Sequence, residues 1–171
     1  MRFFFFSTTH FGLIVDFTQT INVYSLVNGD YLMKGLRLFL NVYGVVSVLL
    51  FGGLFLFTMM DAPILQEGGS LRFMRWEPLA KHIELMLEGV YFVWGIFFFL
   101  AAKNPLRFLS FIDFTIWANA VHGVIMVVQA LMMPQFHYKM FTDVAYCLVL
   151  AVGLWMLRPK GTELAMASAA S

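Results

Sequence analysis

The stretch Asn104–Pro134, with the sequence NPLRFLSFIDFTIWANAVHGVIMVVQALMMP, decides the fold that we expect of this chain. Asparagine is a favoured N-cap, and a proline in the first turn gives up no hydrogen bond, so Asn104 and Pro105 are expected to begin a helix. Pro134 lacks a backbone N–H and disfavours helical geometry at the residue before it, so the helix is expected to end there. Its length and apolar character predict a membrane span, with Leu109–Met132 inside the membrane.

Polar side chains interrupt this apolar helix. Asn119, His122 and Gln129 lie at i, i+3 and i+10, which places them on roughly one face. Asp113 lies on the side opposite His122. Polar groups at membrane depth are costly unless they find partners, so this face is expected to meet other helices and not lipid.

The composition of the whole chain agrees with a membrane protein. It has 171 residues, enough for one domain, and 61% are hydrophobic while 12% are charged. That charged share is about half of what soluble domains carry. The formal net charge of +1 gives no electrostatic support for nucleic-acid binding. Cys147 is the only cysteine, which excludes an internal disulfide, and the sequence has no phosphate-binding glycine loop, HExxH or CxxC motif.

Apolar runs on either side of this stretch predict three further spans, near residues 38–60, 83–102 and 140–157. Every proline of the chain falls at a boundary of an expected helix, which agrees with the helix-ending chemistry of proline. Gly44 and Gly52 lie on one side of the first span and predict close packing of a neighbouring helix. We therefore expect an all-α integral membrane protein, a four-transmembrane-helix antiparallel bundle formed by residues 33–160.

The two ends of the chain are expected to lie outside this bundle. Residues 1–32 begin with a basic residue and four phenylalanines, and Asp16 then breaks the apolar run. Two interpretations remain open for this N-terminal extension. It is either an interfacial helix on the membrane or an over-extended gene prediction, since Met33 followed by Lys34 resembles a natural start. Residues 161–171 are small and polar and are expected to form a flexible tail.

Two connections need a specific expectation. The loop 61–81 is expected to turn at Gly68 and Gly69 and then to form a short interfacial helix at Ser70–Trp76. In that helix Arg72 and Arg75 are expected to point toward water or lipid phosphates. Residues 135–139 are expected to form a tight hairpin before the fourth span.

The distribution of lysine and arginine predicts the orientation, because cytoplasmic loops carry an excess of both. With the N-terminus inside, seven basic residues are cytoplasmic and four are on the opposite side. Both termini are therefore expected to be cytoplasmic. The cytoplasmic residues are Arg2, Lys34, Arg37, Lys103, Arg107, Arg158 and Lys160, and the others are Arg72, Arg75, Lys81 and Lys139.

With this orientation, polar groups of three spans converge on the outer half of the bundle. Glu84 and Glu88 share one face of the second span, which Tyr91 and Gly95 extend. Because the second and third spans are joined by a short connection, Glu88 is expected within reach of His122, directly or through one water, and Gln129 close to Glu84. Asp113 is expected within reach of Lys103 or Arg107. The candidate polar cluster is Glu84, Glu88, Asn119, His122, Gln129 and Asp143.

Structural and functional interpretations of this cluster both remain open. Structurally, the glutamates are wetted at the membrane edge, His122 is a neutral core residue, and Asp143 is an N-terminal helix charge. Functionally, Glu84, Glu88, His122 and Asp143 are candidate metal ligands, and a carboxylate–histidine cluster is also suited to proton relay. His122 is a candidate axial ligand for haem or a chlorophyll-type magnesium, and the many methionines are candidate copper(I) ligands. The sequence selects no cofactor among these.

Several short motifs resemble a family of small, functionally uncharacterised four-helix bacterial inner-membrane proteins. The resemblance implies a four-helix fold and a bacterial inner membrane, and it implies no activity. The chain departs from the family pattern in having only His82 where the second helix is expected to begin with several histidines, and Thr142 where a glycine is expected. The motifs, between about residues 84 and 159, are Gly89-Val90-Tyr91, Gly95-Ile96-Phe97, Ala101-Ala102-Lys103-Asn104-Pro105, Ser110-Phe111-Ile112, Phe114-Thr115-Ile116-Trp117, Val121-His122-Gly123, Met126, Gln129-Ala130-Leu131 and Asp143-Val144.

Two functional hypotheses follow. The first is a non-catalytic scaffold or accessory subunit, packed in the lipid bilayer against other membrane-protein chains or a second copy of itself. The second is a small transporter, or a redox or proton-handling protein, that uses the polar cluster around His122. The two hypotheses differ in whether the carboxylates face a cavity inside the bundle or face outward.

Overall fold

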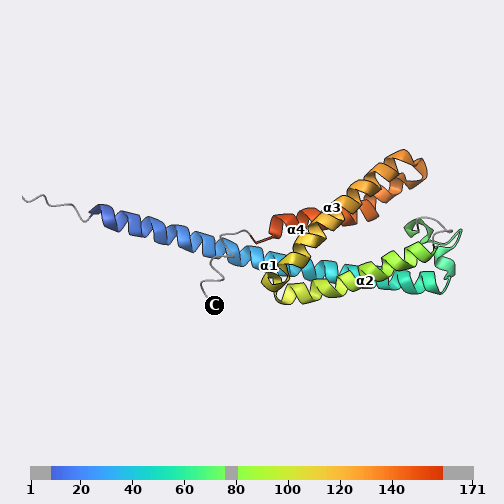
Figure 1. The fold of residues 1–171 in the computed structure, drawn as a ribbon, viewed down its shortest axis with the longest axis horizontal. Coiled ribbons are helices and arrows are strands. Elements are labelled where there is room, and N and C mark those ends of the chain that lie inside the picture. Colours follow the sequence, from blue (N-terminus) through green and yellow to red (C-terminus); the bar gives the residue numbers. More distant parts are fainter. Residues whose placement is uncertain (1–8, 76–80, 160–171) are drawn as a thin grey trace, which may run out of the picture. The chain divides into compact units, whose positions relative to one another are not determined.

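The computed structural model describes residues 9–75 and 81–159, with side chains from residue 29 onward (Figure 1). In this part of the chain the regular structure is entirely helical, as expected, with four α-helices and several short 3-10 helices and no strand. The α-helices are α1 (Thr9–Met59), α2 (Lys81–Lys103), α3 (Leu109–Met132) and α4 (Asp143–Leu157).

Four segments of the described chain are long and apolar enough to cross a membrane. They overlap the four expected spans, and the third and fourth segments also include the 3-10 helix directly before the α-helix. The segments are Gly29–Met59, Lys81–Lys103, Pro105–Met132 and Pro134–Leu157.

The chain separates into two compact units, one formed by Met1–Lys34 with Pro159–Ser171 and the other by Gly35–Arg158. Helix α1 begins at Thr9, well before the expected start of the first span at Leu38. No proline precedes Pro63, so the chain holds no residue that forces a helix to end earlier. Whether residues 1–32 belong to the functional protein stays a prediction. Residues 1–8 and the expected flexible tail, 161–171, lie outside the described residues.

The larger unit is built on helix faces with alternating three- and four-residue spacing. Such spacing is typical of helices that pack with interlocking side chains at small crossing angles. The expected stripe on the second span is confirmed, because its four residues are all buried on α2. The buried series is Glu84, Glu88, Tyr91, Gly95, Phe98 and Ala102 on α2, and Ile112, Ile116, Asn119, Gly123, Met126 and Ala130 on α3.

A closed apolar core joins all four helices at one end of this unit. Its residues come from the Gly35 end of α1 within this unit, the end of α2, the beginning of α3 and the end of α4. Consecutive helices therefore run in opposite directions. We call this group the closed core, and it consists of Leu36, Leu40, Phe98, Ala101, Ala102, Ile112, Ile116, Leu150 and Leu154.

Glycines allow α1 and α2 to approach closely, as the small residues of the first span predicted. A Cβ atom on Gly44 would lie 2.9 Å from the ring of Phe99, and one on Gly52 would lie 3.0 Å from the ring of Phe92. On α2, a Cβ atom on Gly95 would lie 2.7 Å from the Cβ of Ser47. The absence of side chains at these positions makes room for the facing helix.

The connections between the helices begin at prolines, as the sequence predicted. Pro63 begins the 3-10 helix η1 (Pro63–Leu65), and the Asn104 side chain caps η4 (Pro105–Phe108) by accepting a hydrogen bond from the backbone of Arg107 at 3.4 Å. The turn at Gly68 is confirmed by its φ of 84°, a conformation that favours glycine.

Two expected connections differ in the structure. The segment after Pro134 is the eight-residue 3-10 helix η5 (Pro134–Phe141) and not a tight hairpin, because Phe136 and Lys139 are buried and hold it against the bundle. The helix expected over residues 70–76 is only the single turn η2 (Arg72–Met74). Trp76 and Pro78 lie outside the described residues.

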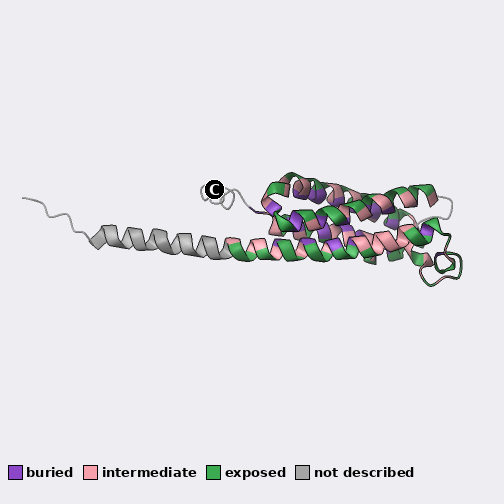
Figure 2. Cartoon of the chain, turned by 90° about the horizontal axis from the view of Figure 1, so that it is seen from below, coloured by how far each residue is buried: buried purple, intermediate pink, exposed green. Residues whose placement is uncertain are grey.

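Exposed residues run along all the helices (Figure 2), and many of them are large and apolar. Leu38, Leu49, Trp117 and Trp155 are each about two-thirds exposed or more. A soluble monomer does not usually leave so much contiguous apolar surface in water, whereas a lipid-facing surface is expected to be apolar.

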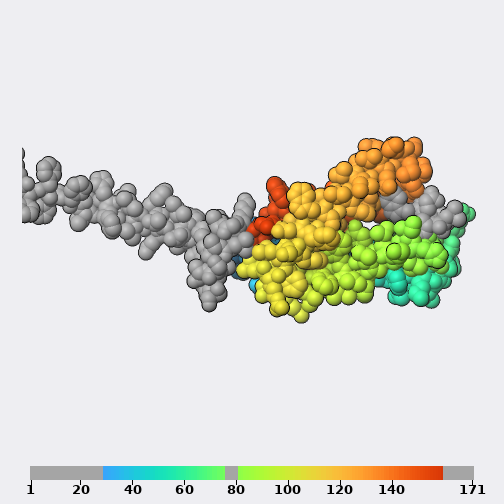
Figure 3. All heavy atoms as spheres, viewed as in Figure 1, coloured from blue at the N-terminus to red at the C-terminus, as the bar shows by residue number. Residues whose placement is uncertain are grey.

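Helices α2 and α3 are in contact near η4, the segment that joins them, and α3 separates from α2 toward η5 (Figures 1 and 3). The closed core lies at the end where the two helices meet.

Candidate functional site

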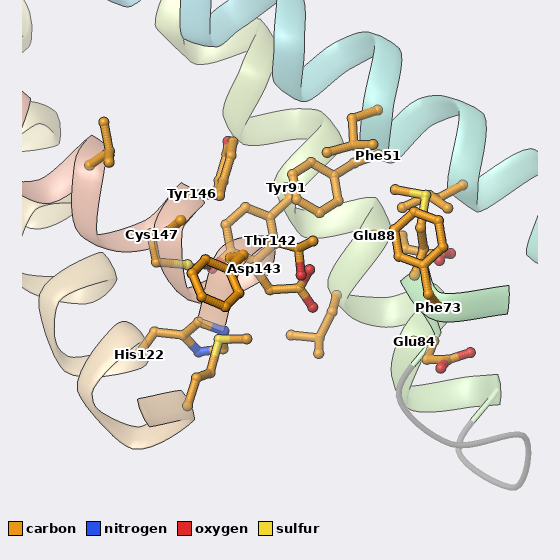
Figure 4. Close-up of a pocket in the computed structure, with 18 of the residues that line it drawn as sticks. Phe51, Phe73, Glu84, Glu88, Tyr91, His122, Thr142, Asp143, Tyr146 and Cys147 are labelled. Atoms are coloured by element: carbon orange, nitrogen blue, oxygen red, sulfur yellow. Dashed lines mark hydrogen bonds between the residues drawn. The ribbon is translucent and has the colours of Figure 1, made fainter. Parts of the chain in front are cut away.

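A cavity of about 530 Å³ lies between the helices at the end away from the closed core. This volume is within the range of about 300–1,000 Å³ that small-molecule sites usually have. All four α-helices contribute to its wall, together with η2 and the last residue of η5. Figure 4 shows polar and aromatic side chains around it, including Phe51, Glu84, Glu88, Tyr91, His122, Asp143, Tyr146 and Cys147.

Aromatic rings form one wall of the cavity. Phe51 of α1 stacks on Tyr91 of α2, with ring centroids 4.7 Å apart and an interplanar angle of 21°. Tyr146 of α4 meets both rings edge-on, at centroid distances of 5.5 Å from Phe51 and 6.1 Å from Tyr91. The Tyr146 hydroxyl is 2.6 Å from Ser47 Oγ, and the Tyr91 hydroxyl is 3.8 Å from Cys147 Sγ. Both hydroxyls therefore have protein partners, which fixes the orientation of the rings.

A buried ion pair lies beside the cavity, near the loop that precedes α2. Arg75 Nε donates to Glu84 Oε2 at 2.9 Å, and Nη2 lies 2.8 Å from the same oxygen. The two side chains are only 7% and 9% exposed. The expectation that Arg75 points toward water or phosphates is wrong, because Arg75 forms an ion pair with Glu84 on the buried face of α2.

A second ion pair ties the same loop to α4. Lys139 is fully buried, and its Nζ donates to the backbone oxygen of Met74 at 2.8 Å and to Asp143 Oδ2 at 3.0 Å. Asp143 lies in the first turn of α4, as its interpretation as an N-terminal helix charge requires. The sequence reasoning counted Lys139 only as an orientation charge. The i, i+4 spacing of Lys139 and Asp143 was the signal that could have identified the pair.

Glu88 differs from these two carboxylates. Its Oε1 accepts a hydrogen bond from Thr58 Oγ1 of α1 at 3.0 Å. Its Oε2 has no hydrogen-bond partner among the described residues, and the carboxylate takes part in no ion pair within that part of the chain. The residue is only 9% exposed and lines the cavity. Burial of a carboxylate with so few partners is costly and calls for an explanation.

His122 lines the cavity from α3, on the side across from Glu88 (Figure 4). Its ring lies 6.1 Å from that of Tyr91, between centroids. No hydrogen bond joins His122 to Glu88 among the described residues, and Thr58 of α1 donates to Glu88 instead. The expected contact through one water stays a prediction. The prediction considered only α2 and α3, whereas Glu88 faces α1 as well. The two residues nevertheless line the same cavity.

The other polar residues of α3 lie away from the cavity. Asn119 is fully buried, and its Nδ2 donates to the backbone oxygen of Thr115 at 3.0 Å. Gln129 is exposed, so its expected burial is wrong, and no hydrogen bond joins it to Glu84 among the described residues. The buried series of α3 passes through Met126 and Ala130, which leaves Gln129 beside the interface and not within it.

Asp113 pairs with Arg158, the residue after α4, and not with Lys103 or Arg107. Both carboxylate oxygens accept, Oδ1 from Arg158 Nε and Oδ2 from Nη2 at 2.8 Å. The pair bridges the first half of α3 to the end of α4. These hydrogen bonds and the Asp113 charge raise the pKa of the Arg158 guanidinium.

The metal hypothesis is not supported by this geometry. Among the described residues, no group of three histidine, cysteine, aspartate or glutamate side chains is arranged to hold a metal ion. Glu84 and Asp143 each have a basic partner, and His122 lies across the cavity from Glu88. The candidate cluster therefore divides into cavity-lining residues (Glu84, Glu88, His122 and Asp143) and residues outside the cavity (Asn119 and Gln129).

Comparison with known proteins adds the family. The model of a family of unknown function, DUF6632, matches residues 32–168, which is most of the chain and extends beyond the range of about 84–159 where the resemblance was expected. No curated protein matches the chain, and no solved structure does. The chain belongs to this family of unknown function, DUF6632.

Proposed function

We propose that this protein is a multi-pass integral membrane protein that binds a small, largely apolar molecule in the cavity between its helices, as a carrier or small transporter. The single observation that carries this proposal is the cavity itself, about 530 Å³ inside the bundle with Glu84, Glu88, His122 and Asp143 in its wall. The two functional hypotheses differ in whether these carboxylates face a cavity or face outward, and the position of Glu84, Glu88 and Asp143 in the cavity wall supports the second hypothesis.

The composition of the cavity also supports a small-molecule site. Ligand sites are concave and mostly apolar, with a few polar groups that fix the orientation of the ligand. Here aromatic and aliphatic side chains form most of the wall, and two of its carboxylates, Glu84 and Asp143, are held by ion pairs. A scaffold or accessory subunit has no need for a cavity of this size, since an empty cavity costs packing energy.

The membrane and the orientation are part of the proposal. The four long apolar helices and their apolar outward faces support a membrane-spanning bundle. The sequence resemblance supports a bacterial inner membrane, and the excess of Lys and Arg supports cytoplasmic termini. Reporter fusions after Arg158 and in the loop at Gly68 are expected to give cytoplasmic and exported signals respectively. The opposite pattern would overturn the orientation.

The direct test fills the cavity. Ala145 lines it, whereas Val152 lies on the same helix, is 53% exposed and does not line it. The wild type, Ala145→Phe and Val152→Phe are purified in mild detergent, and native mass spectrometry identifies co-purifying small molecules and protein chains. We expect a small molecule on the wild type and on Val152→Phe that Ala145→Phe has lost.

Two results would contradict the proposal. Equal retention of the molecule by Ala145→Phe would place it outside the cavity. Co-purification of a stoichiometric protein chain, with no small molecule on any variant, would favour the accessory-subunit hypothesis.

A further inference from the structure

One carboxylate in the wall of the cavity forms no salt bridge within the described part of the chain. Arg75 pairs with Glu84, and Lys139 pairs with Asp143. Glu88 is the carboxylate that lines the cavity and has no basic partner among the described residues. Its Oε1 accepts one hydrogen bond from Thr58, and its Oε2 accepts none in the described structure.

We propose that the ligand of this cavity is an organic cation with an apolar body, and that Glu88 is its counter-ion. This inference rests on the proposed function, because it names the chemical class of the molecule that the cavity binds. A buried carboxylate is stabilised by an opposite charge. Arg75 and Lys139 each form a salt bridge with another carboxylate, Glu84 and Asp143 respectively.

The aromatic wall adds a second and independent feature. Phe51, Tyr91 and Tyr146 all line the cavity and contact one another at centroid distances of 4.7–6.1 Å. The face of an aromatic ring attracts a cation, and the attraction is larger where water is excluded. Tyr91 stacks on Trp94 as well as on Phe51, so Phe51 and Tyr146 are the rings of this wall that are better placed to contact a cation. A carboxylate beside such rings in one cavity is suited to a quaternary ammonium or phosphonium group.

Glu88 can reach the ligand without a rearrangement of the backbone. Its Oε2 is buried in the absence of a ligand, but the terminal torsion of a glutamate has a broad minimum. Rotation about that torsion would turn the free oxygen while the side chain stays beside Thr58. The remaining wall, which includes Leu50, Leu54 and Met126, provides apolar contact for the body of the molecule.

The experiment measures binding of a matched pair of probes to the full chain in nanodiscs of uncharged phosphatidylcholine. Tetraphenylphosphonium is the cation, and triphenylphosphine oxide is a neutral molecule with a similar body. Isothermal titration calorimetry compares the wild type with Glu88→Gln, which keeps the size of the side chain and an acceptor for Thr58. Glu67→Gln is the control, because Glu67 is exposed and does not line the cavity.

We expect saturable binding of the cation to the wild type and to Glu67→Gln. Glu88→Gln should weaken cation binding at least tenfold and change binding of the neutral probe less than twofold. Phe51→Leu, which removes a ring without touching the carboxylate, should weaken cation binding about two- to thirtyfold. Tryptophan fluorescence and thermal unfolding check that each variant is folded.

The outcomes separate this inference from the proposed function. If both probes bind the wild type, Ala145→Phe abolishes both, and Glu88→Gln has no selective effect, the cavity binds small molecules and the cation assignment is wrong. If neither probe binds the wild type saturably, the cation assignment is also wrong. If both probes bind Ala145→Phe as they bind the wild type, binding is outside the cavity and the proposed function fails with it.

Discussion

The two ends of the larger unit, Gly35–Arg158, differ in how the side chains of the four helices pack together. At one end the closed core is filled by leucine, isoleucine, alanine and phenylalanine side chains. At the other end the same helices surround a cavity of about 530 Å³ with buried ion pairs in its wall. The contrast shows that the cavity is not a general consequence of loose helix packing in this chain.

The ion pairs of the two ends differ in the same way. Arg75 and Glu84 at the cavity are 7% and 9% exposed, whereas Arg158 and Asp113 at the closed end are 35% and 39% exposed. A buried pair is costly to form and more costly to break, because the remaining charge is left uncompensated. An exposed pair contributes little, because water and salt screen it. The cavity end therefore depends on its charges, and the closed end depends on its apolar packing.

The largest expected effect comes from breaking the buried pair. Arg75→Met should destabilise the protein by about 3–5 kcal/mol, because Glu84 keeps a buried charge without its partner. Arg75→Met combined with Glu84→Met should recover most of that loss. Unfolding by denaturing detergent measures the free energy of unfolding of the single and the double variant. A single variant as stable as the wild type would mean that the pair is not buried in the membrane.

Truncation of a leucine should reduce the free energy of unfolding more at the closed core than at the cavity. Leu154→Ala in the closed core should cost about 2–5 kcal/mol, since Leu154 is fully buried and its neighbours cannot collapse into the space. Leu54→Ala in the cavity wall should cost about 1 kcal/mol or less, because Leu54 already borders empty space. The same unfolding assay compares them. Equal costs would contradict the difference in packing between the two ends.

Addition of a methyl group should give effects of opposite sign at two glycines. Gly95→Ala should cost about 1–3 kcal/mol, because its Cβ would lie 2.7 Å from Ser47 Cβ and 3.0 Å from the backbone nitrogen of Val48. Gly53→Ala should stabilise α1 by about 0.5–1 kcal/mol, because nothing lies within 4 Å of its Cβ. Thermal unfolding of both variants shows whether each substitution stabilises or destabilises the protein. Destabilisation by Gly53→Ala would mean that another chain covers this surface.

The smallest expected effect is at the exposed pair. Asp113→Asn should cost about 0.2–1 kcal/mol at low salt, because the pair with Arg158 is partly exposed. The cost should shrink as the salt concentration rises, since the Debye length falls to about 3 Å at 1 M. Unfolding of both proteins at low and high salt measures the difference. A cost of several kcal/mol that salt does not change would mean that this pair is buried, like the pair of Arg75 and Glu84.

Much of this fold could be predicted from the sequence because membrane helices leave strong local signals. The prolines at positions 63, 105 and 134 begin 3-10 helices, and Pro159 follows α4. The spacing of Glu84, Glu88, Tyr91 and Gly95 identified the buried face of α2. These features depend on residues that are close in sequence, so periodicity alone reveals them.

The partners of the polar groups could not be predicted in the same way. Glu88 bonds to Thr58, thirty positions earlier, and Asp113 pairs with Arg158, forty-five positions later. Helix periodicity shows which way a residue faces and not which helix is opposite it. Arg75 was expected to point toward water and instead pairs with the buried Glu84, and the pairing of Lys139 with Asp143 was not anticipated.

The central claim is that one end of the bundle is open to a small molecule and the other end is closed. A native cysteine makes this claim testable by chemical labelling. Cys147 is the only cysteine and lines the cavity, and Leu154 lies on the same helix within the closed core. The measurement is the rate of labelling by N-ethylmaleimide of the folded protein in nanodiscs. It compares the wild type with the Leu154→Cys, Cys147→Ala double variant. We predict that Cys147 reacts at least tenfold faster than the cysteine at position 154, and that Ala145→Phe removes the difference. Equal rates at the two positions, or fast labelling that Ala145→Phe leaves unchanged, would contradict this account.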